Sequence, residues 1–392
     1  MRPLLALLLI ASPVMAAPVE QGAPNVPEFK PAFAGQTRAD AVKTRGNVRV
    51  AEIAAGLNKP WGVALLPGGK FLVSEKAGGT LRIIGADGSK SPPLTGTPKV
   101  DARDQGGMMG VSVPGDGWVY FSYAEPRDGG SGLVVARGKL GGTDAAPALT
   151  EVKTIFSMQP TIDSTKHFGG RMVFLPNNMM YITLGERSIV PGRVQAQDPG
   201  SHFGKIVRIG RDGSVPKDNP LVGRAGAKPE IWSWGHRNVL SAALDSRGRL
   251  WEVEMGPKGG DELNLVAKGK DYGWPTITYG EEYSGKPIGQ AITQKAGMEQ
   301  PVYYWDPVIS PSGMAIHSGR GATEWQGNVF IGGLSSKALV RLVLNGDRVV
   351  GEERLLTDRG ERIRDVVEGP AGELYVLTDD ANGKLLKVTV GN

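Results

Sequence analysis

Short apolar runs separated by polar turns recur along the whole chain. Each copy has an apolar run, a turn rich in Pro, Gly, Asn or Asp, and a second apolar run, which is the pattern of a β-hairpin. The six copies begin at Gly62, Gly110, Arg171, Ser241, Met314 and Arg364. They are spaced roughly 50–75 residues apart, and repetition at such a period indicates a propeller or another array of β-units. No segment shows sustained helical periodicity.

The repeats predict an all-β fold, specifically a six-bladed β-propeller. Each hairpin is expected to form the middle of a four-stranded blade. The strand near residues 47–54 precedes the first copy, so we expect it to complete the last blade and close the ring. A two-sheet sandwich is the alternative, but repetition over about 330 residues is longer than one sandwich domain.

The start of the chain has a different pattern. Residues 1–17 combine a charged start, a short apolar core and a small-residue cleavage site, which predicts a secretory signal peptide. Residues 18–46 are rich in Pro, Ala and polar residues and are expected to form an extended N-terminal arm. Residues 47–392 are then the single propeller domain. The chain has no apolar run long enough to span a membrane, so these features predict an exported protein of the bacterial periplasm.

The amino-acid composition limits which kinds of partner and metal site the chain can have. The chain has no cysteine, which excludes disulfides and thiolate metal sites. The net charge of +5 is spread among interspersed charges without a basic block, so no nucleic-acid partner is expected.

The third hairpin offers candidate chemistry at its two ends. His167 precedes the first apolar run and Glu186 follows the second, so closing the hairpin brings the two side chains to one rim. A histidine oriented by a carboxylate is the usual form of a general base near neutral pH. For the pair taken alone, a surface histidine beside a surface glutamate is the alternative.

Three further motifs carry polar groups that suit an anionic ligand and a metal. Arg237 and Asn238 offer a planar fork for a carboxylate and an amide for a carbonyl. The turn at 256–264 is dense in oxygen ligands, which suits Ca²⁺, although its spacing is not that of an EF-hand. Alternation places Arg362 and Arg364 on one face of a strand, where they can clamp an anion; a solvated strand edge is the alternative. The shared target would be a flat, multiply carboxylated ligand.

In combination, these motifs resemble those of the soluble quinoprotein sugar dehydrogenases, or glucose/sorbosone dehydrogenases, which use pyrroloquinoline quinone (PQQ). The resemblance covers most of the chain, from about Pro31 to the C-terminus. The motifs are Pro60-Trp-Gly, Asp104-Gln-Gly-Gly, His167 before its hairpin, Trp234-Gly-His-Arg-Asn, Gly256-Pro with Asp261-Glu262, Asp271-Tyr-Gly-Trp-Pro and Arg362-Ile-Arg-Asp. The resemblance implies a six-bladed propeller that oxidises the C1 hydroxyl of an aldose to a lactone, with hydride transfer to PQQ and a requirement for Ca²⁺.

The resemblance also assigns roles by position. His167 corresponds to the base that takes the C1 hydroxyl proton, and Glu186 stands where the family usually has Asp as the partner of that base. Gln105 resembles the family's substrate-contacting glutamine. The expected cofactor contacts are Arg237, Asn238, Arg362 and Arg364. The carbonyls of Gly256 and Pro257 resemble ligands of the Ca²⁺ that also binds the quinone, and Glu262 and Tyr272 resemble part of a second, structural Ca²⁺ site.

Some positions depart from the family pattern. The family commonly has a cofactor-binding Lys directly after the Leu of a Gly/Ser-Leu-Lys segment, but here Ser335 follows Leu334 and Lys337 comes two positions later. Lys337 is therefore the candidate cofactor contact of that segment. Val239-Leu240-Ser241 replaces the usual Pro-Gln-Gly, and Met108-Met109 replaces Leu-Leu. These departures bear on cofactor affinity rather than on the fold.

Two other functions stay open. A non-redox propeller could bind a sugar or a protein partner, and the departure at Ser335 is its best support. A metal-dependent propeller lactonase would need carboxylates converging from several blades on a central metal. The expected partners of the dehydrogenase are an aldose and an electron acceptor, neither of which the sequence specifies further.

Overall fold

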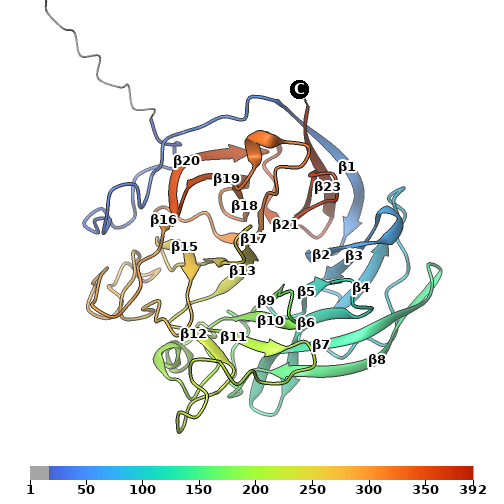
Figure 1. The fold of residues 1–392 in the computed structure, drawn as a ribbon, viewed down its shortest axis with the longest axis horizontal. Coiled ribbons are helices and arrows are strands. Elements are labelled where there is room, and N and C mark those ends of the chain that lie inside the picture. The colour runs from blue at the N-terminus through green and yellow to red at the C-terminus, as the bar shows by residue number, and fades with distance from the viewer. Residues whose placement is uncertain (1–16, 392) are drawn as a thin grey trace, which may run out of the picture.

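A ring of six β-sheets makes up the protein (Figure 1). The computed structural model describes residues 17–391, so the signal peptide predicted at 1–17 lies outside the described residues except for its last position. Within the described part, the one α-helix is the four-residue α1 (Val190–Arg193), and no helix there is long and apolar enough to cross a membrane. The predicted six-bladed propeller is confirmed.

Five blades follow one another in chain order, each an antiparallel sheet. Blade one contains β2 (Pro60–Leu66), β3 (Lys70–Glu75) and β4 (Thr80–Ile84). Blade two contains β5 (Met108–Ser112), β6 (Val119–Arg127), β7 (Gly130–Thr143) and β8 (Ala146–Ser157). Blade three contains β9 (Gly169–Phe174), β10 (Met179–Leu184), β11 (Lys205–Gly210) and β12 (Ile231–Trp234). Blade four contains β13 (Val239–Leu244), β14 (Leu250–Glu254), β15 (Asp261–Val266) and β16 (Tyr303–Trp305). Blade five contains β17 (Pro311–Ile316), β18 (Val329–Gly333), β19 (Ala338–Asn345) and β20 (Arg348–Leu355). The short 3₁₀ helices are η1 (Pro67–Gly69), η2 (Val194–Gln197), η3 (Thr323–Trp325) and η4 (Thr357–Arg359).

The sixth blade joins the two ends of the chain. Its strands are β21 (Ile363–Glu368), β22 (Leu374–Thr378), β23 (Gly383–Gly391) and β1 (Asn47–Leu57). β1 pairs antiparallel with β23, and Figure 1 shows the blue first strand beside the red last one. The predicted closure of the ring by the strand near residues 47–54 is confirmed. Pairing of this kind covers a strand edge that would otherwise be open to other chains.

The repeated hairpins occupy the inner half of each blade, and the expectation that they form its middle was wrong. In each of the six sheets the first strand of the hairpin is the edge strand nearest the ring axis, where it packs against the first strands of neighbouring blades. Backbones approach closely there: a Cβ added at Gly110 would lie 2.5 Å from the carbonyl oxygen of Gly170 in the next blade. Side-chain-free positions are therefore required where the blades converge.

The N-terminal arm is anchored on blades four and five, which explains why it is ordered without regular structure. The backbone N–H groups of Asn25 and Val26 donate to the carboxylate of Asp306, at 2.9 and 3.0 Å. Ala41 forms an isolated parallel bridge with Glu352 of β20. The arm thus leads along two blades before it enters β1.

Candidate active site

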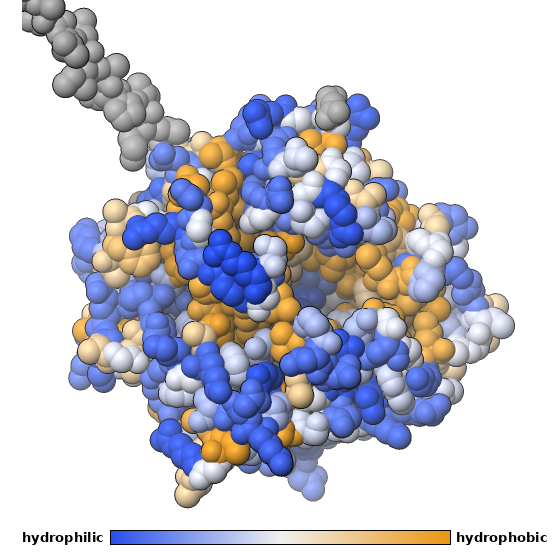
Figure 2. Space-filling model, in the orientation of Figure 1, coloured by the Kyte–Doolittle hydropathy of each residue, from blue (hydrophilic) through white to orange (hydrophobic). Residues whose placement is uncertain are grey.

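A cavity of about 620 Å³ opens at one end of the ring axis, within the range of about 300–1,000 Å³ typical of small-molecule sites. Loops that precede the first strand or follow the second strand of all six blades line it. Figure 2 shows the surface hollowed near the middle of the ring. Four residues predicted for substrate or cofactor line the cavity, namely Gln105, Asn238, Arg362 and Arg364. Arg237 and Lys337 are not part of its lining.

His167 and Glu186 are in direct contact, as the hairpin predicted. His167 Nδ1 lies 2.9 Å from Glu186 Oε1, and both side chains are buried. The other oxygen of Glu186 accepts the backbone N–H of Ser188 at 2.6 Å. An ionised carboxylate can only accept hydrogen bonds, so Nδ1 of His167 must carry the hydrogen that it donates to Glu186. In the neutral imidazole the lone pair is then on Nε2. Within residues 17–391, no group hydrogen-bonds to Nε2.

Backbone geometry places this histidine beside the predicted substrate residue. His167 has a positive φ of 50°, a conformation that costs energy for a residue with a side chain and that clusters at functional sites. Its backbone N–H donates to the side-chain oxygen of Gln105 at 2.9 Å. The next two residues, Phe168 and Gly169, line the cavity. His167 and Glu186 are not themselves part of the lining, so the pair lies directly behind the cavity wall, between blades two and three.

Burial is the main cause of the shifted pKa of the His167 imidazole. It lowers the pKa of His167 to about 4, and the nearby positive charge of Arg237 adds to this effect. The hydrogen bond and charge of Glu186 act in the opposite direction but do not outweigh burial. The carboxylate of Glu186 thus raises the pKa of His167, but burial keeps the net pKa well below the usual histidine value. The imidazole is neutral at pH 7.

A carboxylate partner does not by itself distinguish His167 from the other histidines. His202 Nε2 lies 2.7 Å from a carboxylate oxygen of Glu230. His236 Nδ1 lies 3.3 Å from a carboxylate oxygen of Glu254. In His202 the second nitrogen accepts the backbone N–H of Gln159, so both nitrogens are engaged. Position beside the cavity and an unengaged Nε2 distinguish His167, and neither feature is visible in the sequence.

The two arginines of the last blade converge, as alternation predicted. Arg362 Nη2 and Arg364 Nη2 lie 2.9 and 3.0 Å from Oδ2 of Asp379. Asp379 follows β22 and also lines the cavity. The clamp therefore carries a net charge of about +1 rather than +2, because one carboxylate is shared by both guanidinium groups.

All four residues predicted for metal binding surround a second, small cavity behind the first. Its volume is about 10 Å³, close to the roughly 10–15 Å³ that one water-sized sphere requires. It is lined by the predicted residues Gly256, Pro257, Glu262 and Tyr272, together with Arg237, Glu254 and Met255. Met255 lines both cavities. The carbonyl of Gly256 already accepts a hydrogen bond from Arg237 Nη1 at 2.6 Å, so Arg237 contacts the predicted metal turn rather than the large cavity.

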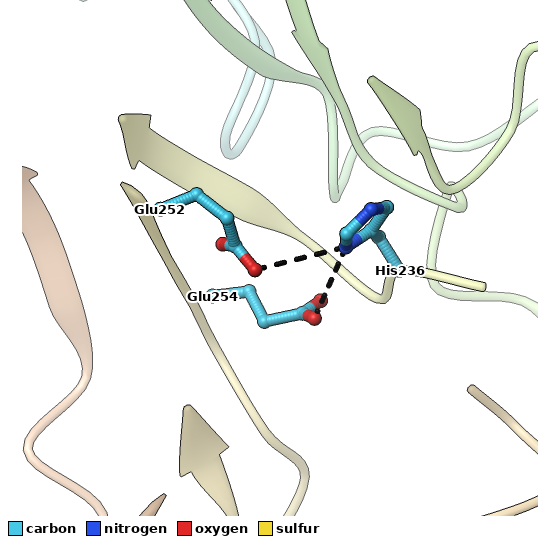
Figure 3. Close-up of side chains that lie close together, drawn as sticks. All are labelled: His236, Glu252 and Glu254. Atoms are coloured by element: carbon cyan, nitrogen blue, oxygen red, sulfur yellow. Dashed lines mark hydrogen bonds and ion pairs between the residues drawn. The ribbon is translucent and has the colours of Figure 1, made fainter. Parts of the chain in front are cut away.

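Buried acceptors accumulate beside this small cavity (Figure 3). Glu252 and Glu254 lie on one face of β14 and both point toward His236 Nδ1, at 3.7 and 3.3 Å. The amide nitrogen of Asn264 donates to Glu252 at 2.8 Å and to Glu262 at 3.2 Å. Burial, and then the charge of Glu254, raise the pKa values of Glu252 and Glu262 well above the usual range.

The acceptors in this cluster outnumber the donors. Among the described residues, no lysine or arginine forms an ion pair with Glu252, Glu254 or Glu262. Glu252 Oε2 and Asn264 Oδ1 are buried and lack a hydrogen-bond partner. A buried acceptor without a donor costs roughly 1–3 kcal/mol. The donor set of carboxylates and amide oxygen fits a hard cation such as Ca²⁺.

Comparison with known proteins identifies the family of the chain. The sequence profile of the family described as Glucose / Sorbosone dehydrogenase matches residues 57–387. The chain belongs to the glucose/sorbosone dehydrogenase family. It is 42% identical over 352 residues to the aldose sugar dehydrogenase YliI of Escherichia coli K12, covering 88% of this chain and 94% of that protein.

Two solved structures of aldose sugar dehydrogenases superpose on the ring. The apo-form crystal structure of the soluble enzyme from E. coli has a TM-score of 0.83 at 41% identity, covering 88% of this chain and 100% of the other. The PQQ-bound form from Streptomyces coelicolor has a TM-score of 0.71 at 29% identity, covering 89% and 100%. Membership in the glucose/sorbosone dehydrogenase family supports an oxidoreductase that acts on sugars.

The structure adds cavity residues to which the sequence analysis gave no role. Lys59, Lys76 and Asp379 line the cavity, as does Trp61. Trp61 belongs to the Pro60-Trp-Gly motif, so the sequence contained a signal for it. Lys76 and Asp379 follow β3 and β22, and only closure of the ring brings them to the same cavity. At the small cavity, Glu254 is a lining residue to which the sequence analysis gave no role. Its position two residues before the Gly256-Pro257 turn was the signal that could have found it.

Proposed function

We propose that this protein is a PQQ- and Ca²⁺-dependent aldose dehydrogenase in which His167 is the general base. The observation that carries the proposal is the neutral imidazole directly behind the cavity wall, with Nδ1 on Glu186 and Nε2 unengaged. The PQQ-bound relative supports the choice of cofactor. We also propose the periplasm as its location, on the signal-like pattern of residues 1–17 alone.

The cavity suits a flat anionic cofactor. Four cationic side chains, Lys59, Lys76, Arg362 and Arg364, line it, and the Nε of Arg364 is buried without an acceptor. Cationic donors of this kind bind carboxylates through charge-assisted hydrogen bonds. PQQ, when bound, supplies the acceptor for a hydride.

The residues of the chain supply the proton chemistry. Gln105 lies against the backbone of His167 and can orient the sugar so that its C1 hydroxyl faces Nε2. Nε2 takes the hydroxyl proton as the C1 hydrogen leaves with its electron pair, and the sugar becomes a lactone. Glu186 keeps the imidazole in the required tautomer and stabilises the positive charge that it gains.

For Ca²⁺, the residues best able to hold the ion are Glu254 and Glu262, with the carbonyl of Pro257. The carbonyl of Gly256 is engaged by Arg237, so it contributes only where that hydrogen bond is given up. The ion would supply positive charge beside the large cavity, because Met255 separates the two spaces.

The test of the function is reconstitution. Purified protein is mixed with PQQ and Ca²⁺, the quinone absorbance is followed, and dye reduction is measured with a panel of aldoses. Aldose-dependent dye reduction that needs PQQ supports the dehydrogenase. Sugar binding without reduction would favour the binding module. A lactonase is disfavoured, since Asp379 in the central cavity is held by two arginines.

Removal of calcium is expected to destabilise the protein. A ligand that binds only the native state stabilises it by about 2.7 kcal/mol at a hundred-fold excess over Kd. EDTA should therefore lower the melting temperature by several degrees, and Ca²⁺ should restore it. Glu262→Gln should abolish the effect of EDTA, whereas exposed Glu28→Gln should retain it. An unchanged melting temperature with EDTA would refute the calcium site.

Activity is expected to persist at acidic pH. Only the neutral imidazole can accept a proton, and its pKa in the folded protein is about 4. As pH falls, kcat/KM should therefore hold its plateau through pH 6.5, the ordinary histidine pKa, and decline only near pH 4. The measurement is a pH–rate profile with saturating PQQ and a melting curve at each pH. A decline centred near pH 6.5 would contradict the burial of the base.

A further inference from the structure

Lys76 is a cation of the large cavity that has no anionic partner. It follows β3 in blade one and lines the cavity. Its Nζ donates to the backbone oxygen of Asp104, which leaves two of its three donors available. Among residues 17–391, no carboxylate lies within 4.0 Å of this Nζ. Lys76 can therefore bind a ligand without breaking an ion pair.

The two arginines of this cavity differ in this respect, because Arg362 and Arg364 share the carboxylate of Asp379. Lys59 also forms no ion pair within residues 17–391, but it is exposed, whereas Lys76 is half-buried. Positive charges lie close to Lys76: burial lowers its pKa, the charges of Arg364 and Lys59 lower it further, and the charges of Asp379 and Asp104 offset only part of this effect. An anion placed among these groups would relieve their mutual repulsion. The structure thus provides an anion-binding position at Lys76 that the protein itself does not fill.

Blade five does not present a cation to the cavity at the position where the family commonly has one. Leu334 lines the cavity, but Ser335 after it is exposed and its hydroxyl donates to the backbone oxygen of Val308 at 3.1 Å. Lys337 is exposed at the turn between β18 and β19, with a positive φ of 50°, and is not part of the lining. Blade five therefore lacks the cation that the family commonly has there, whereas blade one presents the ammonium group of Lys76, which forms no ion pair within residues 17–391.

We propose that Lys76 binds a carboxylate of PQQ and replaces the lysine that this family commonly carries on blade five. The inference rests on the proposed function, since it names a residue that holds the proposed cofactor. The ammonium group approaches from the side of Gln105, whereas the arginine clamp lies on blade six. Lys76 and the clamp thus offer cations from two neighbouring blades, which fits a ligand that carries more than one carboxylate.

The test is the affinity of the purified protein for PQQ in the presence of Ca²⁺, measured by equilibrium titration without substrate. Lys76→Met should weaken binding by roughly ten- to a hundred-fold, the effect of losing a charge-assisted hydrogen bond. Lys76→Arg, which retains the charge, should recover most of the loss. Lys70→Met is the matched control, because Lys70 lies at the other end of β3 and pairs with Asp144 at 2.5 Å; its affinity should equal that of the wild type.

The outcomes separate this inference from the proposed function. Wild-type protein that binds no PQQ would overturn both. Wild-type binding with equal affinity in Lys76→Met would overturn the inference alone and leave the dehydrogenase intact. Weakened binding in Lys337→Met, with Lys76→Met unaffected, would likewise overturn it and show that the turn after β18 reaches the cofactor.

Discussion

Replacing His167 by alanine is expected to lower turnover by about 10²–10⁴-fold, the usual contribution of a general base. The C1 hydrogen leaves as hydride only when the hydroxyl proton is removed with it, and Nε2 of His167 is the unengaged base directly behind the cavity wall. PQQ affinity should stay nearly intact, because the neutral imidazole contributes no positive charge that would hold a carboxylate of the cofactor. The measurements are single-turnover sugar oxidation and a PQQ titration of the same preparation.

A second substitution separates the base from its partner. Glu186→Gln keeps an oxygen that accepts from Nδ1 but removes the charge, so turnover should fall less than in His167→Ala. The pH–rate profile should shift to lower pH, because Glu186 raises the pKa of the imidazole. A His167→Ala protein that is folded, binds PQQ and oxidises aldoses at the wild-type rate would remove this histidine from the mechanism.

Replacing Asp365 by alanine is expected to destabilise the fold by about 3–5 kcal/mol, the effect of removing one partner of a buried ion pair. Asp365 of β21 accepts from both terminal nitrogens of Arg171 in β9, at 2.8 and 3.2 Å. It also accepts the backbone N–H of Val63 in β2, at 3.1 Å. One carboxylate with no exposed side-chain surface thus connects blades six, three and one across the ring axis.

The cause of this loss can be separated from the loss of packing. In Asp365→Ala, Arg171 is left as a buried charge without a partner. In the double variant Arg171→Met with Asp365→Leu, no charge is left buried, so much of the stability should return. Chemical denaturation of the three proteins gives the free energies of unfolding. Asp365→Ala with a wild-type unfolding midpoint would show that the ion pair does not stabilise the ring.

The periodicity of the sequence was sufficient to predict the fold, but it did not predict the position of the hairpins within each blade. Six hairpins predicted six blades, and an extra strand before the first predicted the closure of the ring by β1. The hairpins were expected in the middle of each blade, and they lie at the axis. A hairpin pattern records which strands are neighbours in the chain, whereas the inner position depends on how closely blades can approach, as at Gly110.

Local spacing predicted the contacts within one hairpin or one strand. His167 and Glu186 meet because the two strands between them pair, and Arg362 and Arg364 share a face because they are two residues apart. Lys337 was predicted at the cofactor from its nearness to Ser335 in the chain, but it is exposed in its turn and is not part of the cavity lining. Spacing cannot predict the direction of a side chain in a turn of unknown shape.

The sequence by itself determined the features that depend on neighbours in the chain. These are the strands, their hairpins, the ring of six blades, and the contact between the two ends of the third hairpin. What only the tertiary structure decided depends on groups from different blades. It set the pKa of His167 to about 4, since burial and Arg237 come from the folded surroundings. It also paired Asp379 with the arginine clamp and brought Lys76 of the neighbouring blade one to the same cavity, where it forms no ion pair with any residue of 17–391. Charge and burial act through space, and the chain order of the residues does not record these distances.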